Sequence, residues 1–113
     1  MCIRDRFLSD HGEELWDHGG HGHAHTLYEE QVRVPLVVRV PDAAGSRWER
    51  SSAGIESAPV GLIDVAPTIL DVLGIQAPDR FEGVSFASPA RGRPVIFSEA
   101  TLHGGELLSL IHI

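Results

Sequence analysis

The chain has 113 residues, with 16 acidic side chains, 9 arginines, no lysine and a formal net charge of −7. An acidic chain without lysine lacks the basic surface by which proteins bind nucleic acids. No apolar run approaches the roughly 20 residues that a membrane-spanning helix requires. The length suits one small domain, although the motifs described below indicate part of a larger one.

The two ends of the chain are expected to be artefacts. If Met1–Arg6 is encoded by ATG TGT ATA AGA GAC AG, the reverse complement translates to LSLIHI, which is the sequence of Leu108–Ile113. The same DNA resembles the transposase adapter used to prepare sequencing libraries. We therefore expect residues 1–6 and 108–113 to derive from adapter and residues 7–107 to be protein. Cys2, the single cysteine, then carries no information about the redox compartment.

The first part of the chain is predicted to contain a strand, a loop, a short helix and a second strand. Phe7–Ser9 is typical of the end of a buried strand, and residues 10–25, rich in Gly, His and acids, show no apolar period and predict a loop. Thr26–Gln31 predicts a short helix whose first threonine is the N-cap of a capping box. Val34–Val40 is a continuous β-branched run, which predicts a strand buried on both faces, as in parallel sheets.

The second part contains the clearest helix, Ile63–Gly74. Its apolar residues fall on one stripe at helical spacing and are expected in the core: Ile63, Ala66, Ile69, Leu70 and Leu73. Asp64 is expected to cap the helix or to lie in its first turn, and Gly74 is expected to end the helix. Residues 42–57 predict an exposed connection, and Pro94–Ser98 a final strand. The order of strands and helices is an α/β pattern.

Asp10 and His11 directly follow the first predicted strand. In open α/β sheets, sites lie beyond the carboxyl ends of the strands, so these two residues are placed at that edge. Carboxylate and imidazole are good ligands for divalent ions, and Gly12 permits the bend by which adjacent ligands face one ion. An Asp-His pair on a surface loop is more often simply solvated, so the pair alone does not establish a metal site.

Four histidines interleaved with glycines follow: His18, His21, His23 and His25. Imidazole is a metal ligand when neutral and an anion partner when charged. The residues alone leave three interpretations open: further metal ligands, binding of an anionic substrate group, or a His-rich loop without a fixed role.

The order of these motifs resembles the second half of the sulfatase N-terminal catalytic domain, in the alkaline-phosphatase-like superfamily. That family shows a strand ending in S/T-D-H/N-G, a Gly/His loop, T-x-Y-E, and R/H-V-P before a hydrophobic strand. Here these are Ser9–Gly12, Thr26–Glu29 and Arg33–Leu36. VGLIDVAPTILDVLGI, FEGVSF and RPVIFSEA resemble the helix, turn and strand that come next. The resemblance implies that residues 7–107 are a fragment of an α/β, three-layer sandwich with a mainly parallel sheet.

The resemblance also implies a role for Asp10 and His11 as metal ligands. The ion would be divalent, usually Ca²⁺ in sulfatases, with Mn²⁺ or Zn²⁺ as alternatives. The other ligands and a formylglycine nucleophile, made within a C/S-x-P-S-R motif, would come from an earlier part of the parent domain; this motif is absent from the 113 residues. The parent would cleave sulfate esters of small molecules or glycans, and the chain alone is expected to be inactive.

One departure from the family pattern concerns the substrate. Many sulfatases place a sulfate-binding lysine four residues before the tyrosine of T-x-Y-E, where this chain has Ala24. His23 and His25 flank that position, and we expect one of them, preferably His25, to take the catalytic role of the lysine. A His-Thr pair before V-P also resembles the phosphomutase and phosphatase branches, in which such a histidine binds a second metal. His25 is therefore expected to be a substrate contact or a metal ligand.

Three functions remain open. The first is a sulfatase-like hydrolase. The second is a phosphonate or phosphodiester hydrolase, or a phosphoethanolamine-type transferase, of the same superfamily. The third is a non-catalytic domain with a His-rich metal-binding loop. A C-x-P-S-R motif upstream would separate the first from the second, and the absence of both that motif and the N-terminal acidic pair would favour the third.

Overall fold

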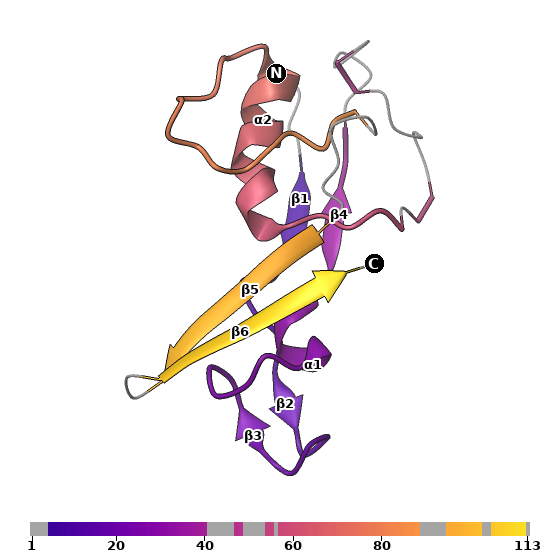
Figure 1. Cartoon of the computed structure of the whole chain (residues 1–113). Helices are drawn as coiled ribbons and strands as arrows, with labels where there is room; N and C mark the ends of the chain where they lie inside the picture. Colours follow the sequence, from indigo (N-terminus) through magenta and orange to yellow (C-terminus); the bar gives the residue numbers. More distant parts are fainter. Residues whose placement is uncertain are drawn as a thin grey trace. The chain divides into compact units, whose positions relative to one another are not determined.

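The computed structural model describes residues 5–40, 47–48, 54–55, 57–88, 95–102 and 105–112. In chain order, its elements are β1 (Arg6–Leu8), β2 (Glu14–Leu15), β3 (His21–Gly22), α1 (Glu29–Val32), β4 (Leu36–Val38), the 3-10 helix η2 (Leu62–Asp64), α2 (Val65–Leu73), β5 (Val95–Leu102) and β6 (Gly105–His112) (Figure 1). Two compact units result, one built on residues 6–38 and 97–112 and the other mainly on residues 39–96. Within the described residues, no helix has the length and apolar character needed to cross a membrane.

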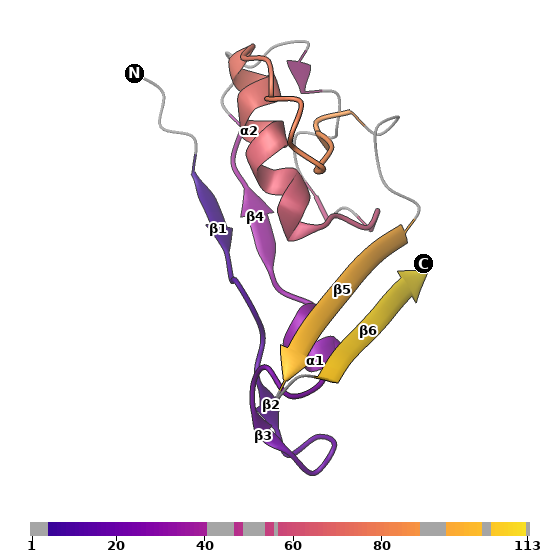
Figure 2. The ribbon, with the colours of Figure 1, turned by 60° about the vertical axis from the view of Figure 1, so that its left-hand side comes forward.

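Strands β1 and β4 lie side by side and pair antiparallel, with Arg6 opposite Val38 and Leu8 opposite Leu36 (Figure 2). Both predicted strands are therefore present, but β1 is not buried as predicted, since Phe7 is 68% and Leu8 40% exposed. Among the described residues, however, the pairs with an assigned register are antiparallel, so a mainly parallel sheet is not confirmed. A β-branched run suits either kind of ladder, and the direction depends on the connection. Here the connection is a hairpin and a short helix, without a long crossover helix.

Strand β4 is not buried on both faces, contrary to prediction. Its residues alternate between half-buried and exposed, and Val37 keeps 60% of its surface exposed. This alternation is the pattern of a strand with one covered face.

The predicted loop at residues 10–25 contains the β2–β3 hairpin, in which Glu14 pairs with Gly22 and Leu15 with His21. The Trp16 N–H donates to the Gly20 carbonyl across the turn at 2.9 Å. An alternating apolar pattern, the usual hairpin signal, is missing from this stretch. The hairpin depends instead on a buried carboxylate, described below.

Helix α1 begins later than predicted, with Tyr28 as N-cap and no side-chain cap. The predicted cap, Thr26, accepts a hydrogen bond from Gln31 Nε2 at 2.5 Å. The capping box is therefore wrong, because the threonine hydroxyl is used by a buried side chain and not by the helix backbone.

Helix α2 confirms the predicted helix, and Gly74 ends it in the left-handed conformation with φ 74°. Asp64 is the N-cap residue of α2, but its side chain makes no capping bond to that helix. Its Oδ2 instead accepts a hydrogen bond from the Gly61 N–H at 3.1 Å, at the start of η2. The Asp64 carboxylate also accepts the Val84 N–H at 2.8 Å, and the Thr68 hydroxyl accepts the Phe86 N–H at 3.0 Å. These bonds hold the segment around Val84–Phe86 along one face of the helix.

The buried residues of α2 are Pro67, Thr68 and Val72, and they differ from the predicted apolar stripe. Val72 is 4% exposed and forms a small core with Ala87, whereas Ile63 is 54% and Leu73 45% exposed. Ala66 is exposed as well. The expected burial of the stripe is thus wrong at Ile63, Ala66 and Leu73. Polar anchors explain the difference, because Asp64 and Thr68 draw the following segment onto their own face.

Strand β5 includes the predicted strand and extends beyond it to Leu102. It pairs with β6, which runs in the opposite direction in Figure 1. Strand β6 includes five of the six residues expected to derive from adapter at this end, Leu108–His112.

Candidate metal and substrate site

The His-rich loop is organised by the carboxylate of Glu14, which is 1% exposed. Its Oε1 accepts hydrogen bonds from the backbone N–H groups of Gly20 at 2.7 Å and His18 at 3.2 Å. Its Oε2 lies 3.0 Å from His25 Nε2 and 3.2 Å from the amide nitrogen of Gln31, which donates to it. A buried carboxylate costs stability unless such donors surround it. Glu14 therefore holds the turn of the hairpin and the segment before α1 together.

The surroundings of Glu14 act on its pKa in opposite directions. Burial raises it, while hydrogen bonds from the Gly20 N–H, the His25 ring and the His18 N–H lower it. The net result is a pKa below the ordinary value for glutamate. Glu14 is therefore ionised near neutral pH, and sequence reasoning had given it no role.

Gly12 allows the strand-end loop to approach α1. The Gly12 N–H donates to the Gln31 carbonyl at 2.8 Å, and the Glu13 N–H donates to the Glu30 carbonyl at 3.0 Å. A Cβ atom at Gly12 would overlap the Glu30 carbonyl. The glycine that was predicted to permit a bend is thus also required by close packing.

The two predicted metal ligands lie next to each other in the exposed loop after β1. Asp10 Oδ1 is 3.8 Å from His11 Nε2. His11 Nδ1 lies 2.8 Å from the Gly12 carbonyl, which only accepts hydrogen bonds, so Nδ1 carries a hydrogen. Its Nε2 is then left with a lone pair facing Asp10. Metal-binding histidines commonly use this arrangement, so the pair fits one half of a cation site.

The pKa of His11 is raised, chiefly by the hydrogen bond to the Gly12 carbonyl. Desolvation lowers it, and the negative charges of Asp10 and Glu13 raise it further. The loop therefore presents a cation-attracting surface.

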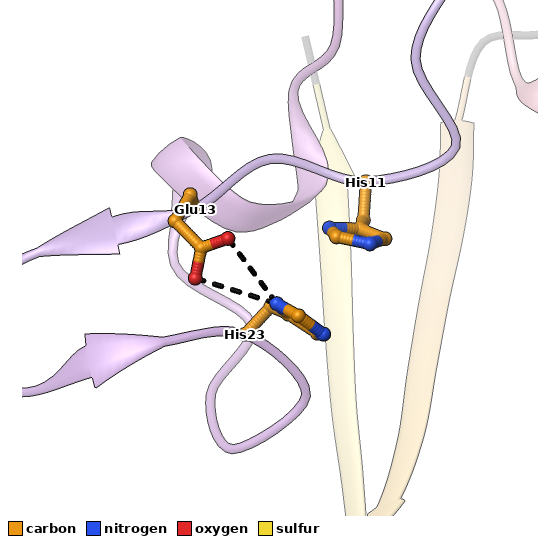
Figure 3. Close-up of side chains that lie close together, drawn as sticks. All are labelled: His11, Glu13 and His23. Carbon is orange, nitrogen blue, oxygen red and sulfur yellow. Dashed lines mark hydrogen bonds and ion pairs between the residues drawn. The ribbon is translucent and has the colours of Figure 1, made fainter.

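His23 is brought to His11 by the hairpin. The two rings stack with centroids 4.2 Å apart and planes inclined by 30°. His23 Nδ1 lies 3.2 Å and 3.3 Å from the two carboxylate oxygens of Glu13, which faces it (Figure 3). Glu13 was not assigned from the sequence, although residues two apart on an extended segment share a face, as His11 and Glu13 do.

His25 is turned toward Glu14 and is half-buried. Its Nδ1 lies 3.1 Å from the His23 carbonyl and its Nε2 3.0 Å from the Glu14 carboxylate. Both ring nitrogens therefore face acceptors within the chain. Ala24, between the two histidines, adopts a left-handed conformation with φ 66°, which is uncommon for alanine. The loop thus separates two neighbouring histidines, with His23 facing His11 and His25 facing Glu14.

The other two histidines of the loop have aromatic partners. His18 stacks on Tyr28 with ring centroids 3.7 Å apart, and its Nδ1 lies 2.6 Å from the Glu30 carboxylate. The His21 ring lies beside the Trp16 ring, with ring centroids 5.7 Å apart. A second group of possible metal ligands has one ligand atom per residue within 4.8 Å of the others, from Glu14, His18 and Glu30. Because Glu14 is engaged by four donors, we interpret this second group as a hydrogen-bond network.

The fold and this site can be compared with known proteins. The chain is similar over 96% of its length to a solved structure of a protein in complex with its substrate D-glucosamine-2-N,6-O-disulfate, with a TM-score of 0.66 and 22% identity, covering 23% of that chain. The Sulfatase family model matches residues 6–75.

Three known proteins are similar to this chain in sequence. N-acetylglucosamine-6-O-sulfatase of Bacteroides thetaiotaomicron is 33% identical over 94 residues, which are 82% of this chain and 14% of that protein. Human arylsulfatase K is 34% identical over 80 residues, 70% of this chain and 13% of that protein. The multifunctional alkaline phosphatase superfamily protein PehA of Trinickia caryophylli is 40% identical over 94 residues, 78% of this chain and 16% of that protein.

The similarity in structure places the described residues in a fold shared with that solved protein. The family match and the relatives show that the chain belongs to the sulfatase family, which confirms the resemblance noted from the motifs. The chain spans about one seventh of the length of the first of these relatives.

Proposed function

We propose that the protein containing this chain is a metal-dependent hydrolase of sulfate esters, with Asp10 and His11 as two of its metal ligands. The observation that carries the proposal is the geometry of this pair in a chain of the sulfatase family. Asp10 Oδ1 and His11 Nε2 are 3.8 Å apart at the end of a strand, and His11 Nδ1 is already committed to the Gly12 carbonyl. A divalent ion held there would polarise a sulfate oxygen and stabilise negative charge on the nucleophile.

Ca²⁺ suits this role if further oxygen ligands join the pair, because it binds six to eight oxygens. Mn²⁺ and Zn²⁺ remain alternatives, since both accept imidazole and carboxylate. The additional acidic ligands and the formylglycine nucleophile would come from the rest of the catalytic domain. Residues 7–107 would then be one portion of a three-layer domain with a mainly parallel sheet, flanked in this sequence by adapter-derived ends.

His23 and His25 would serve the substrate in different ways. Both nitrogens of His25 face acceptors, so His25 would hold the loop in place. His23 Nδ1 faces Glu13, which leaves Nε2 available to the transferring group. This geometry favours His23 over His25, the residue preferred from the sequence, as the substrate contact.

A phosphoryl enzyme of the same superfamily is the second candidate. The observation that favours it is the 40% identity to the multifunctional alkaline phosphatase superfamily protein PehA. Phosphonate or phosphodiester hydrolysis would use the same metal ligands with a different nucleophile.

The test is a substrate comparison on the full-length protein. We expect kcat/KM for an aryl sulfate to exceed that for the matching aryl phosphate and phosphonate monoester by about a hundredfold or more, because the site would stabilise one transition state preferentially. Mass spectrometry of the C/S-x-P-S-R peptide should show formylglycine. A preference for the phosphorus esters would favour the second candidate, and no turnover of any ester would contradict both.

A further inference from the structure

We propose that His11, Glu13 and His23 form a binding site for a transition-metal ion, with Zn²⁺ as the representative ion. One ligand atom from each residue lies within 4.8 Å of the other two. The three side chains come from two segments, the loop after β1 and the end of the β2–β3 hairpin, and they converge on one side of the loop (Figure 3). The proposal rests on this geometry and does not depend on the hydrolytic function.

The donor set selects the class of ion. Two imidazoles and one carboxylate suit Zn²⁺, Cu²⁺, Ni²⁺ or Fe²⁺, whereas Ca²⁺ requires a shell of oxygens. The site therefore differs in chemistry from a Ca²⁺ site at Asp10 and His11, which would need further oxygen ligands.

The spacing of Glu13 and His23 already matches that of two ligands on one ion. Ligands with bonds of about 2.0–2.1 Å in a tetrahedral shell lie roughly 3.3 Å apart. His23 Nδ1 is 3.2 Å and 3.3 Å from the Glu13 oxygens, so the two side chains need little change in spacing to bind one ion. The His11 ring stacks on the His23 ring with centroids 4.2 Å apart, which places a third ligand beside this pair.

The orientation of His11 is a second, independent observation. Its Nδ1 donates to the Gly12 carbonyl at 2.8 Å, which fixes the tautomer and keeps the lone pair on Nε2. Gly12 in turn is held by its hydrogen bond to the Gln31 carbonyl at 2.8 Å. One ligand is therefore oriented by the backbone before any ion binds.

A consequence follows from the shared residue. His11 would belong both to this site and to the proposed Asp10–His11 site, so the two ions would compete. With Ca²⁺ as the ion at Asp10 and His11, Zn²⁺ should inhibit the full-length enzyme, and added Ca²⁺ should relieve the inhibition.

The experiment is a titration of the full chain with Co²⁺, whose visible absorption reports an ordered site, followed by displacement with Zn²⁺. We expect one tight site in the wild type. Glu13→Gln and His23→Gln should each weaken it by about tenfold or more. The control His21→Gln removes a loop histidine outside the cluster and should leave the affinity unchanged.

Several results would overturn the proposal. They are no Co²⁺ binding by the wild type, unchanged affinity in Glu13→Gln and His23→Gln, or an equal loss in His21→Gln, which would indicate unspecific binding by a His-rich loop. The side chains of Glu13 and His23 are 45% and 51% exposed, so glutamine should not disturb folding, and circular dichroism checks this. Asp10→Asn should keep the Co²⁺ site even though it removes a ligand of the proposed catalytic ion, which separates this proposal from the proposed function.

Discussion

Glu14 Oε2 and His25 Nε2 lie 3.0 Å apart, and this buried contact joins the first strand of the hairpin to the segment that precedes α1. The same carboxylate also accepts hydrogen bonds from two backbone N–H groups of the intervening turn, those of His18 and Gly20. A loop rich in glycine has a high conformational entropy to lose on folding. Glu14 offsets that loss with a set of charge-assisted hydrogen bonds, and it thereby fixes where His23 and His25 point.

Replacing the Glu14 carboxylate should loosen the loop. In Glu14→Gln, one oxygen becomes an NH₂ group that faces N–H donors, so some of these hydrogen bonds are lost. We expect the amide hydrogens of Gly20 and His18 to exchange on the order of tenfold faster. The control Glu29→Gln breaks only an exposed ion pair with Arg33 and should leave these rates unchanged. Equal protection in Glu14→Gln and wild type would contradict the role of Glu14.

The same carboxylate predicts how stability depends on pH. Because the pKa of Glu14 is lowered in the folded state from its ordinary value of 4.5, its ionised form favours folding. That contribution is present above the ordinary pKa and is lost as the pH falls through the lowered value. Urea unfolding over this acidic range should show a shallower loss of stability in Glu14→Gln than in the wild type. Parallel curves for the two proteins would rule out a titrating Glu14.

Gly12→Ala should destabilise the site by about 1–3 kcal/mol, because the new methyl group meets the Glu30 carbonyl and the backbone must shift. Thermal unfolding measures the change. Gly61→Ala is the matched control, since a Cβ there makes only ordinary contacts at 3.4 Å. It should stay within about 0.5 kcal/mol of the wild type. A tolerated alanine at Gly12 would show that the close approach to α1 is not required.

A buried residue of α2 and an exposed residue of η2 predict a contrast in stability. Val72 is 4% exposed, so Val72→Ala removes buried methyl groups and should lower the free energy of unfolding by about 1–2 kcal/mol. Ile63→Ala, at a residue that is 54% exposed, should cost about 0.5 kcal/mol or less in the same chain. Chemical denaturation of both variants gives the comparison, and the reverse order would mean that the apolar stripe predicted from the sequence is the buried face.

The sequence predicted those features that depend on local chemistry. Helical spacing and a terminal glycine are local signals, and they placed α2 with its end at Gly74. The position of Asp10 and His11 after a strand was also predictable, because β1 and the loop adjoin in the chain.

Features that depend on distant partners were not predictable. Glu14 looked like one of many acidic loop residues, since its donors lie up to 17 positions away in the sequence. The buried row of α2 was missed because Asp64 and Thr68 bind the backbone of a segment about twenty residues later. The antiparallel pairing of β1 and β4 could not be read from a β-branched run, which fits both kinds of ladder.

The central claim is that Asp10 binds the catalytic metal ion, and metal content measured together with turnover tests it most directly. The full-length protein should be compared as wild type, Asp10→Asn and the control Asp17→Asn, whose exposed side chain accepts a hydrogen bond from the Leu15 N–H. We predict that Asp10→Asn loses bound metal and sulfate ester turnover together, while Asp17→Asn keeps both. Wild-type metal content and turnover in Asp10→Asn would contradict the claim.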